Sequence, residues 1–88
     1  MRVQCDTNIL LRLFDTADPH HQTADRAVDA LLVRGDELTL LPQNLYEFWG
    51  VLTRPKKYNG YDQTPAAADA ELAALPARFT ILDEPGHV

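Results

Sequence analysis

Asp6 is the residue whose position in this sequence is best suited to chemistry. It directly follows a short predicted strand, and Thr7 and Asn8 come next, at the start of a predicted helix. A carboxylate in this partly shielded position favours a cation or a basic partner, because an unpaired charge is costly there. Mg²⁺ suits such a place, since it binds one or two carboxylates and keeps several waters. The alternative, preferred for Asp6 taken alone, is that the side chain only caps the helix.

Glu47 is the second candidate acid. It lies in an otherwise apolar stretch, two positions after Leu45 and off the apolar stripe to which Leu45 belongs. Its helix is predicted to start just after the second strand, so the side chain could point toward the same end of the sheet as Asp6. The two acids would then converge on one cation. The alternative is a solvent-facing acid on an amphipathic helix, which is far commoner for a single glutamate.

A cluster of three basic residues, Arg54, Lys56 and Lys57, follows the same helix with no acid among them. The cluster is a candidate contact for phosphates, although cations after a helix C-terminus also stabilise the helix dipole. Tyr58 and Tyr61 stand beside it, and they could either stack on bases or pack the loop. The residue types therefore allow a local nucleic-acid contact at this point of the chain.

Other reactive side chains have simpler interpretations. His20 and His21 have no Cys or His at ligand spacing, so an exposed first helical turn is expected. Cys5 is predicted to be a buried small hydrophobe, because no His is placed as its base. Asp83 and Glu84 could be a pair of acids beyond a strand end, but a polar turn is the simpler interpretation. The sequence contains no glycine-rich phosphate loop and no Ser/His/Asp pattern.

The composition limits the classes of protein that fit. The chain has 88 residues, 45% hydrophobic and 24% charged, which suits one small domain over residues 1–88. The net charge of −5 argues against broad electrostatic capture of nucleic acid, although a local basic cluster can still hold a polyanion. A single cysteine, no apolar stretch of bilayer length and an early acid lead us to expect a cytoplasmic protein without a membrane partner.

Periodic patterns and breaking residues predict the elements that position these side chains. Strands are expected near residues 2–5, 37–41 and 79–82, and helices over 9–14, 19–34, 45–53 and 65–75. Thr7 or Asn8 is expected to cap the first helix and Asp18 the second, which Gly35 ends. The order β-α-α-β-α-α-β implies a parallel sheet with helices packed on it, an α/β fold. Ligands of such sheets collect beyond the carboxyl ends of the strands.

Two segments of the chain resemble the PIN-domain nuclease family. The segment Met1–Leu13 resembles the family's opening, in which a strand runs into an Asp-Thr-Asn or similar triplet. The segment Gln43–Pro55 resembles the second family motif, where a helix presents an acid near its start. The other predicted helices and the last strand follow the family's layout, so the resemblance covers nearly the whole chain. Many members of the family are VapC-type toxins of bacterial toxin–antitoxin modules.

The resemblance implies a three-layer α/β/α fold and Mg²⁺- or Mn²⁺-dependent cleavage of RNA. Carried over to this sequence, Asp6 and Glu47 would be catalytic metal ligands, and Thr7 or Asn8 would orient Asp6 or a water. The metal would lower the pKa of that water for attack on phosphorus and offset charge on the phosphate oxygens. An RNA substrate and an antitoxin protein are the partners that the resemblance implies.

The family pattern also contains two later acids, from a further helix and strand, that this sequence does not match. The sequence ends after about three strands of the sheet, so we expect weak binding of Mg²⁺ or Mn²⁺ and low activity of the chain alone. A homodimer or a complementing polypeptide could complete the site. The alternatives are an inactive PIN fragment that serves as a dimerisation or binding module, and an unrelated α/β structural protein whose acids only cap helices.

Overall fold

The computed structural model of the chain describes residues 1–82. Along these residues the elements are β1 (Arg2–Gln4), α1 (Thr7–Phe14), α2 (His21–Val33), β2 (Glu37–Leu40), α3 (Pro42–Thr53), the 3₁₀ helix η1 (Lys56–Tyr58), α4 (Pro65–Ala74), the 3₁₀ helix η2 (Leu75–Ala77) and β3 (Thr80–Ile81). The predicted order of strands and helices is confirmed, and short 3₁₀ turns are added after α3 and α4. The fold class is α/β, as predicted.

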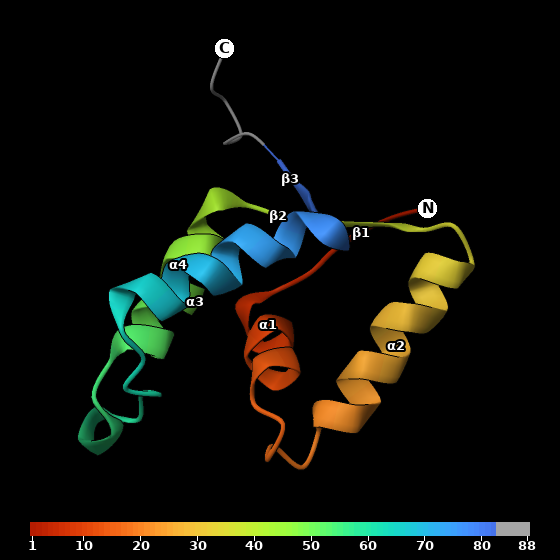
Figure 1. Cartoon of the computed structure of the whole chain (residues 1–88). Coiled ribbons are helices and arrows are strands. Elements are labelled where there is room, and N and C mark those ends of the chain that lie inside the picture. Colours follow the sequence, from red (N-terminus) through yellow and green to blue (C-terminus); the bar gives the residue numbers. More distant parts are fainter. Residues whose placement is uncertain (83–88) are drawn as a thin grey trace.

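The three strands form one parallel sheet in the order β1-β2-β3. β2 is the central strand, and its residues Leu38, Thr39 and Leu40 are buried. Because the strands are parallel, their carboxyl ends share one edge of the sheet. The chain leaves β1 into α1 and leaves β2 into α3 at this edge (Figure 1). The topology therefore places the first turns of α1 and α3 together.

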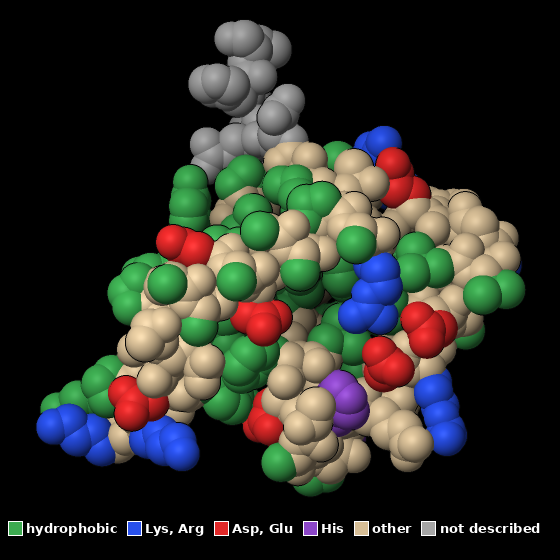
Figure 2. All heavy atoms as spheres, viewed as in Figure 1, with side chains coloured by type: hydrophobic (Ala, Val, Ile, Leu, Met, Phe, Trp, Pro, Cys, Tyr) green, Lys and Arg blue, Asp and Glu red, His purple; other side chains and the backbone are tan. Residues whose placement is uncertain are grey.

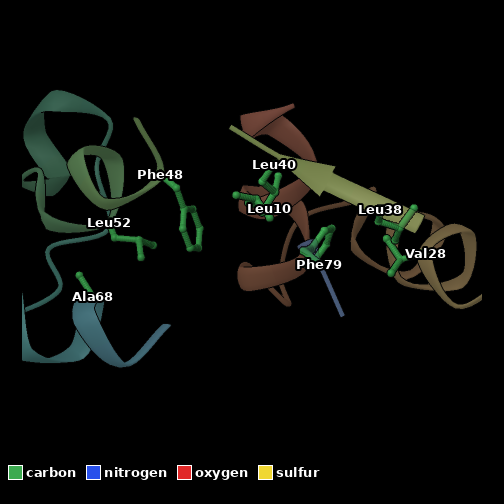
Figure 3. Packing of buried hydrophobic residues seen from close by; sticks show 8 residues of the cluster. All are labelled: Leu10, Val28, Leu38, Leu40, Phe48, Leu52, Ala68 and Phe79. Atoms are coloured by element: carbon green, nitrogen blue, oxygen red, sulfur yellow. The ribbon is translucent and has the colours of Figure 1, made fainter. Parts of the chain in front are cut away.

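The helices are held by a single hydrophobic core. α1 packs against both α2 and α3, and α4 packs against α3 (Figure 1). Figure 3 shows the buried side chains of this core, which come from all four helices, from β2 and from the residue just before β3: Leu10, Val28, Leu38, Leu40, Phe48, Leu52, Ala68 and Phe79. Burying one such leucine or phenylalanine contributes roughly 1.5–3 kcal/mol. No helix within residues 1–82 has the length and hydrophobicity needed to cross a membrane.

The helix starts differ from the prediction at α1, α2 and α3, and α3 begins at Pro42 rather than near residue 45. Asp6 caps α1, which confirms the alternative considered for this residue, and Thr7 and Asn8 do not: the Asp6 backbone is extended and its Oδ1 accepts the Ile9 N–H at 3.1 Å. α2 begins at His21 rather than at Pro19, because the Asp18 carboxylate accepts the His20 N–H at 2.7 Å inside a tight turn. The carboxylate thus closes the turn and does not cap the helix.

The predicted end of α2 is confirmed at Gly35. Its φ of +92° is the left-handed conformation that glycine adopts without strain and that stops the helix. This stop turns the chain directly into β2, so the glycine sets where the central strand begins.

The segment after α3 folds back onto the end of that helix. Its backbone N–H groups bind α3 carbonyls, Tyr61 to Val51 at 3.1 Å and Gln63 to Leu52 at 2.8 Å. A Cβ at Gly60 would lie 2.0 Å from the Arg54 carbonyl oxygen, so only glycine allows this close approach. The predicted loop is therefore a compact turn, fixed to the helix that carries Glu47.

Candidate functional site

The first turns of α1 and α3 are joined by side-chain hydrogen bonds. The Thr7 hydroxyl donates to Oε2 of Glu47 at 3.4 Å, and the Asn44 amide donates to the Thr7 hydroxyl at 3.3 Å. The amide oxygen of Asn44 accepts the Leu41 N–H at 2.8 Å, which fixes Asn44 at the start of α3. Asp6 directly precedes Thr7, so this network brings both predicted acids to the same edge of the sheet.

The two acids have no cationic partner among residues 1–82. Asp6 and Glu47 are both exposed, and neither forms an ion pair within residues 1–82. Oδ1 of Asp6 is engaged by the helix cap, and Oε2 of Glu47 is engaged by the Thr7 hydroxyl. The other oxygen of each carboxylate has no partner among the described residues. The edge therefore presents negative charge and open acceptor atoms to a ligand.

A groove runs from this network along the junction of α1 and α3. Its lining includes the site residues Thr7, Asn8 and Glu47, and it extends to Arg54; the complete set is Thr7, Asn8, Leu11, Tyr46, Glu47, Gly50, Val51 and Arg54. Asn8 is exposed within it and forms no side-chain hydrogen bond among the described residues. The predicted supporting residues thus lie beside Glu47 in one continuous surface.

The structure separates the three basic residues that the sequence groups together. Arg54 lies at the end of the groove, whereas Lys56 and Lys57 are exposed on η1 and do not line it. The Lys57 ammonium lies 5.2 Å from the centre of the Tyr58 ring, a cation–π distance. Figure 2 shows Lys and Arg side chains gathered at the lower left, where the turn after α3 protrudes in Figure 1. Of the three, Arg54 is the one placed beside the acids.

Tyr61 packs inside the protein rather than facing a ligand. Its ring lies edge-on to that of Phe14, with centroids 5.3 Å apart, and its hydroxyl donates to Oδ2 of Asp15 at 2.8 Å. Of the two interpretations of this tyrosine, packing of the loop is the one that the structure supports. Tyr61 thereby attaches the turn after α3 to the end of α1.

The donors at this edge suit a hard divalent ion. They are all oxygens, from Asp6, Glu47 and the Thr7 hydroxyl, and Mg²⁺ needs only one or two carboxylates when waters and a phosphate fill its octahedron. Among residues 1–82, no three or more His, Cys, Asp or Glu side chains gather closely enough to hold a metal ion. Asp83 and Glu84, the other acids considered from the sequence, lie outside the described residues. The described donors are therefore compatible with a partly solvated ion.

The remaining reactive side chains have structural surroundings. Burial, and then the charge of Asp6, raise the pKa of the Cys5 thiol above its usual 9.0, so its thiolate is disfavoured. Nδ1 of His21 lies 2.7 Å from the Arg12 carbonyl oxygen, which ties the start of α2 to α1. His20 is exposed, as predicted. None of these residues joins the acids at the sheet edge.

Two residues of the site were missed by sequence reasoning. Asn44 carries the hydrogen bond between the helices, and Tyr46 is 74% exposed beside Glu47. The signal for Asn44 was its place three residues after the N-cap position Leu41, where a side chain can reach back to the cap N–H. The signal for Tyr46 was its position off the buried stripe, next to Glu47.

The comparisons with known proteins agree with the fold. The family model of the PIN domain matches residues 3–88, nearly the whole chain. A search of curated proteins finds no match. The matched region includes both Asp6 at the end of β1 and Glu47 on α3. The chain therefore belongs to the PIN domain family of nucleases.

Proposed function

We propose that this protein is a Mg²⁺- or Mn²⁺-dependent ribonuclease, of the kind that acts as a VapC-type toxin in a bacterial toxin–antitoxin module. The observation that carries the proposal is the 3.4 Å hydrogen bond from Thr7 to Glu47, which joins the residue after Asp6 to the second acid. Acids 41 positions apart in the sequence are thus brought to one edge of a parallel sheet, where ligands of such sheets bind.

Each residue of the edge has a role in this proposal. Asp6 and Glu47 hold the ion through their open carboxylate oxygens, and Thr7 orients Glu47 while Asn44 orients Thr7. Asn8 faces the groove, where its amide can bind the attacking water or a phosphate oxygen. The ion, when bound, activates a water and offsets charge on the phosphate. With two carboxylates from the described residues, binding of the ion is weak without RNA.

The proposal is tested by RNA cleavage with purified protein. We expect single-stranded RNA to be cleaved with Mn²⁺ or Mg²⁺ and not with EDTA, and Asp6→Asn or Glu47→Gln to lower the rate by about 100-fold or more. The matched control is Asp29→Asn, which removes an exposed acid from α2, outside the site. Cleavage that persists in EDTA, or that Asp6→Asn leaves intact, contradicts the proposal.

The proposal extends to partners and location. The VapC-type role implies an antitoxin protein that masks the exposed carboxylates. It also implies a homodimer or a complementing polypeptide that supplies further ligands, and a cytoplasmic site of action. Co-purification of the chain with the product of a neighbouring open reading frame, and loss of cleavage in that complex, is the expected result.

A second candidate function rests on the outer edge of β1. Among the described residues β1 pairs only with β2, through hydrogen bonds that use the backbone of Met1 and Cys5. Within residues 1–82 no strand pairs with the other side of β1, so this edge can accept a further strand. The alternative is therefore a catalytically inactive PIN module that pairs through this edge. A stable dimer by light scattering, with no cleavage under any metal condition, selects it.

A further inference from the structure

The two faces of α3 have different surroundings. One face is buried against the core through Phe48 and Leu52, with Leu45 and Trp49 packed beside them. The opposite face lines the groove along α1 with Tyr46, Glu47, Gly50 and Val51, and the groove continues to Arg54, the residue after the helix. These positions recur at intervals of three and four residues, so they form one continuous stripe along the helix. The groove face of α3 is therefore accessible to a ligand that extends beyond Glu47.

Gly50 lies in the middle of the groove face. A glycine inside a helix is destabilising relative to alanine, so it calls for a local reason. A Cβ at Gly50 would meet no atom within 4 Å among the described residues, so packing inside the protein does not require the glycine. By contrast, Gly60 is required by the Arg54 carbonyl, 2.0 Å from its Cβ position. The open space at Gly50 leaves room for a ligand to approach the backbone of α3.

Arg54 provides a cation at the far end of the groove. Its side chain is exposed and forms no ion pair within residues 1–82. Its backbone is held in place, because its carbonyl accepts the Asp62 N–H at 2.8 Å. Arg54 follows the last residue of α3 and lies seven residues after Glu47, which corresponds to about 10 Å along the helix axis. Arg54 is therefore too far along the groove to share a ligand atom with Glu47.

Tyr46 provides an aromatic face at the acidic end of the groove. Its side chain is 74% exposed, and it is one of the groove-lining residues. A large aromatic ring left open beside a polar site is suited to stacking with an unpaired base. A base in a duplex is already stacked, so the ring favours a single strand.

We propose that the groove between α1 and α3 holds a single strand of RNA that runs from Glu47 over Gly50 to Arg54. Tyr46 stacks on a base near the acids, Gly50 lets the strand approach the helix backbone, and Arg54 binds the phosphate of a neighbouring nucleotide. This inference rests on the proposed function, because the acids mark where the strand is cut. It concerns binding, so it can be tested without cleavage.

The test is binding of a fluorescein-labelled, cleavage-resistant 2′-O-methyl RNA oligomer, followed by anisotropy in EDTA. Arg54→Ala is expected to weaken binding roughly tenfold. It should also reduce the slope of log K against log salt by about 0.7 between about 50 and 200 mM. The matched control is Arg26→Ala, which removes an exposed arginine of α2 outside the groove and should leave the slope unchanged.

Substitutions at Gly50 and Tyr46 of α3 test the proposal independently of Arg54. Gly50→Ala should raise the Tm, because no atom opposes the added methyl, whereas Gly50→Leu should keep the fold and weaken binding at least about tenfold. Tyr46→Ala should weaken binding roughly 5- to 100-fold, and Tyr46→Phe should restore it. Thermal melting of each variant separates loss of binding from loss of folding.

The outcomes distinguish this inference from the proposed function. If the groove variants lose binding as expected while no condition gives cleavage, the groove stands and the nuclease proposal fails. If Asp6→Asn abolishes cleavage but Gly50→Leu and Arg54→Ala bind like the unchanged protein, the groove assignment is wrong. It is also overturned if the unchanged protein does not bind the oligomer, or binds duplex RNA equally well without an effect of Tyr46→Ala.

Discussion

The two ends of the sheet treat their acidic residues in opposite ways. At the amino end of β2, the Asp36 side chain is only 5% exposed, and it accepts from the Met1 ammonium at 3.0 Å and from Nε of Arg34 at 2.7 Å. The next residue, Glu37, pairs with Nε of Arg2 at 2.8 Å. At the carboxyl end, Asp6 and Glu47 are exposed and have no cation within residues 1–82.

The contrast separates acids that hold the fold from acids that are available to a ligand. Hydrogen bonding from the N-terminal ammonium, and then from Arg34, lowers the pKa of Asp36 below its usual 3.8, so this acid stays charged and paired. The acids of the other edge accept hydrogen bonds from neutral donors, the Ile9 N–H and the Thr7 hydroxyl, and no cation of residues 1–82 compensates their charge. That edge can therefore accept a cation that residues 1–82 do not supply.

The largest effect is expected from the core that joins the two ends. Leu10 of α1 is 1% exposed and packs in the common hydrophobic cluster. Leu10→Ala should lower the free energy of unfolding by about 2–5 kcal/mol, because it removes buried contacts and leaves a cavity. Urea unfolding measures this. The control Val33→Ala changes a side chain that is 89% exposed, and it should stay within about 0.5 kcal/mol.

Replacing the paired acid should cost stability in a way that depends on pH. Asp36→Asn removes a carboxylate whose pKa is lowered in the folded protein, so its contribution is present above the unfolded value and is lost as the pH falls through the folded value. The Tm should drop by several degrees at neutral pH, and the difference from the unchanged protein should vanish in acid. Melting curves from about pH 7 to about pH 2.5 test this, and a difference that is constant with pH would falsify the pairing.

Adding Mn²⁺ should stabilise the protein through the unpaired acids alone. At ten times the dissociation constant, ligand binding adds about 1.4 kcal/mol, so the Tm should rise by a few degrees. Asp6→Asn should remove this rise. Asp36→Asn should keep it, even though its own Tm is lower. A Mn²⁺ shift that Asp6→Asn retains would show that the ion binds elsewhere.

Asp15, at the end of α1, is an intermediate case and gives the smallest effect. Its carboxylate accepts a hydrogen bond from the neutral Tyr61 hydroxyl. Burial of Tyr61 is the main cause that raises its pKa from 10.0 to about 12, and the hydrogen bond to Asp15 is the second. This contribution is fully present below pH 10 and is lost as the pH rises through the folded value. Tyr61→Phe should cost about 1 kcal/mol at neutral pH. The difference should shrink in alkali, as denaturation at a series of pH values can show.

Much of the fold follows from local patterns in the sequence. Alternating residues mark β1, and the stripe of Phe48 and Leu52 on α3 predicts that Glu47 faces away from the core, as it does. The start of α2 was wrong because Asp18 can bond either to a helix terminus or to its own turn. Only the geometry of the connection from α1 decides between the two.

The site could be predicted only in part. The positions of Asp6 and Glu47 after two strands of a parallel sheet indicate a shared edge, but their roles as metal ligands stay predictions. The link between them depends on Thr7 and Asn44, which lie 37 residues apart, a separation at which local periodicity carries no signal. The separation of Arg54 from Lys56 was equally hidden. It depends on a turn in which Asn59 and Asp62 adopt positive φ, a conformation that sequence seldom reveals for residues other than glycine.

The cap of α1 also bears on ion selectivity. One oxygen of the Asp6 carboxylate accepts the hydrogen bond of the Ile9 amide, so this side chain can coordinate an ion through a single oxygen rather than in bidentate fashion. Ca²⁺ often takes both oxygens of a carboxylate in a crowded shell of seven or so ligands, whereas Mg²⁺ and ions of similar size accept one each in an octahedron. The same amide bond that starts the helix would therefore disfavour the larger ion.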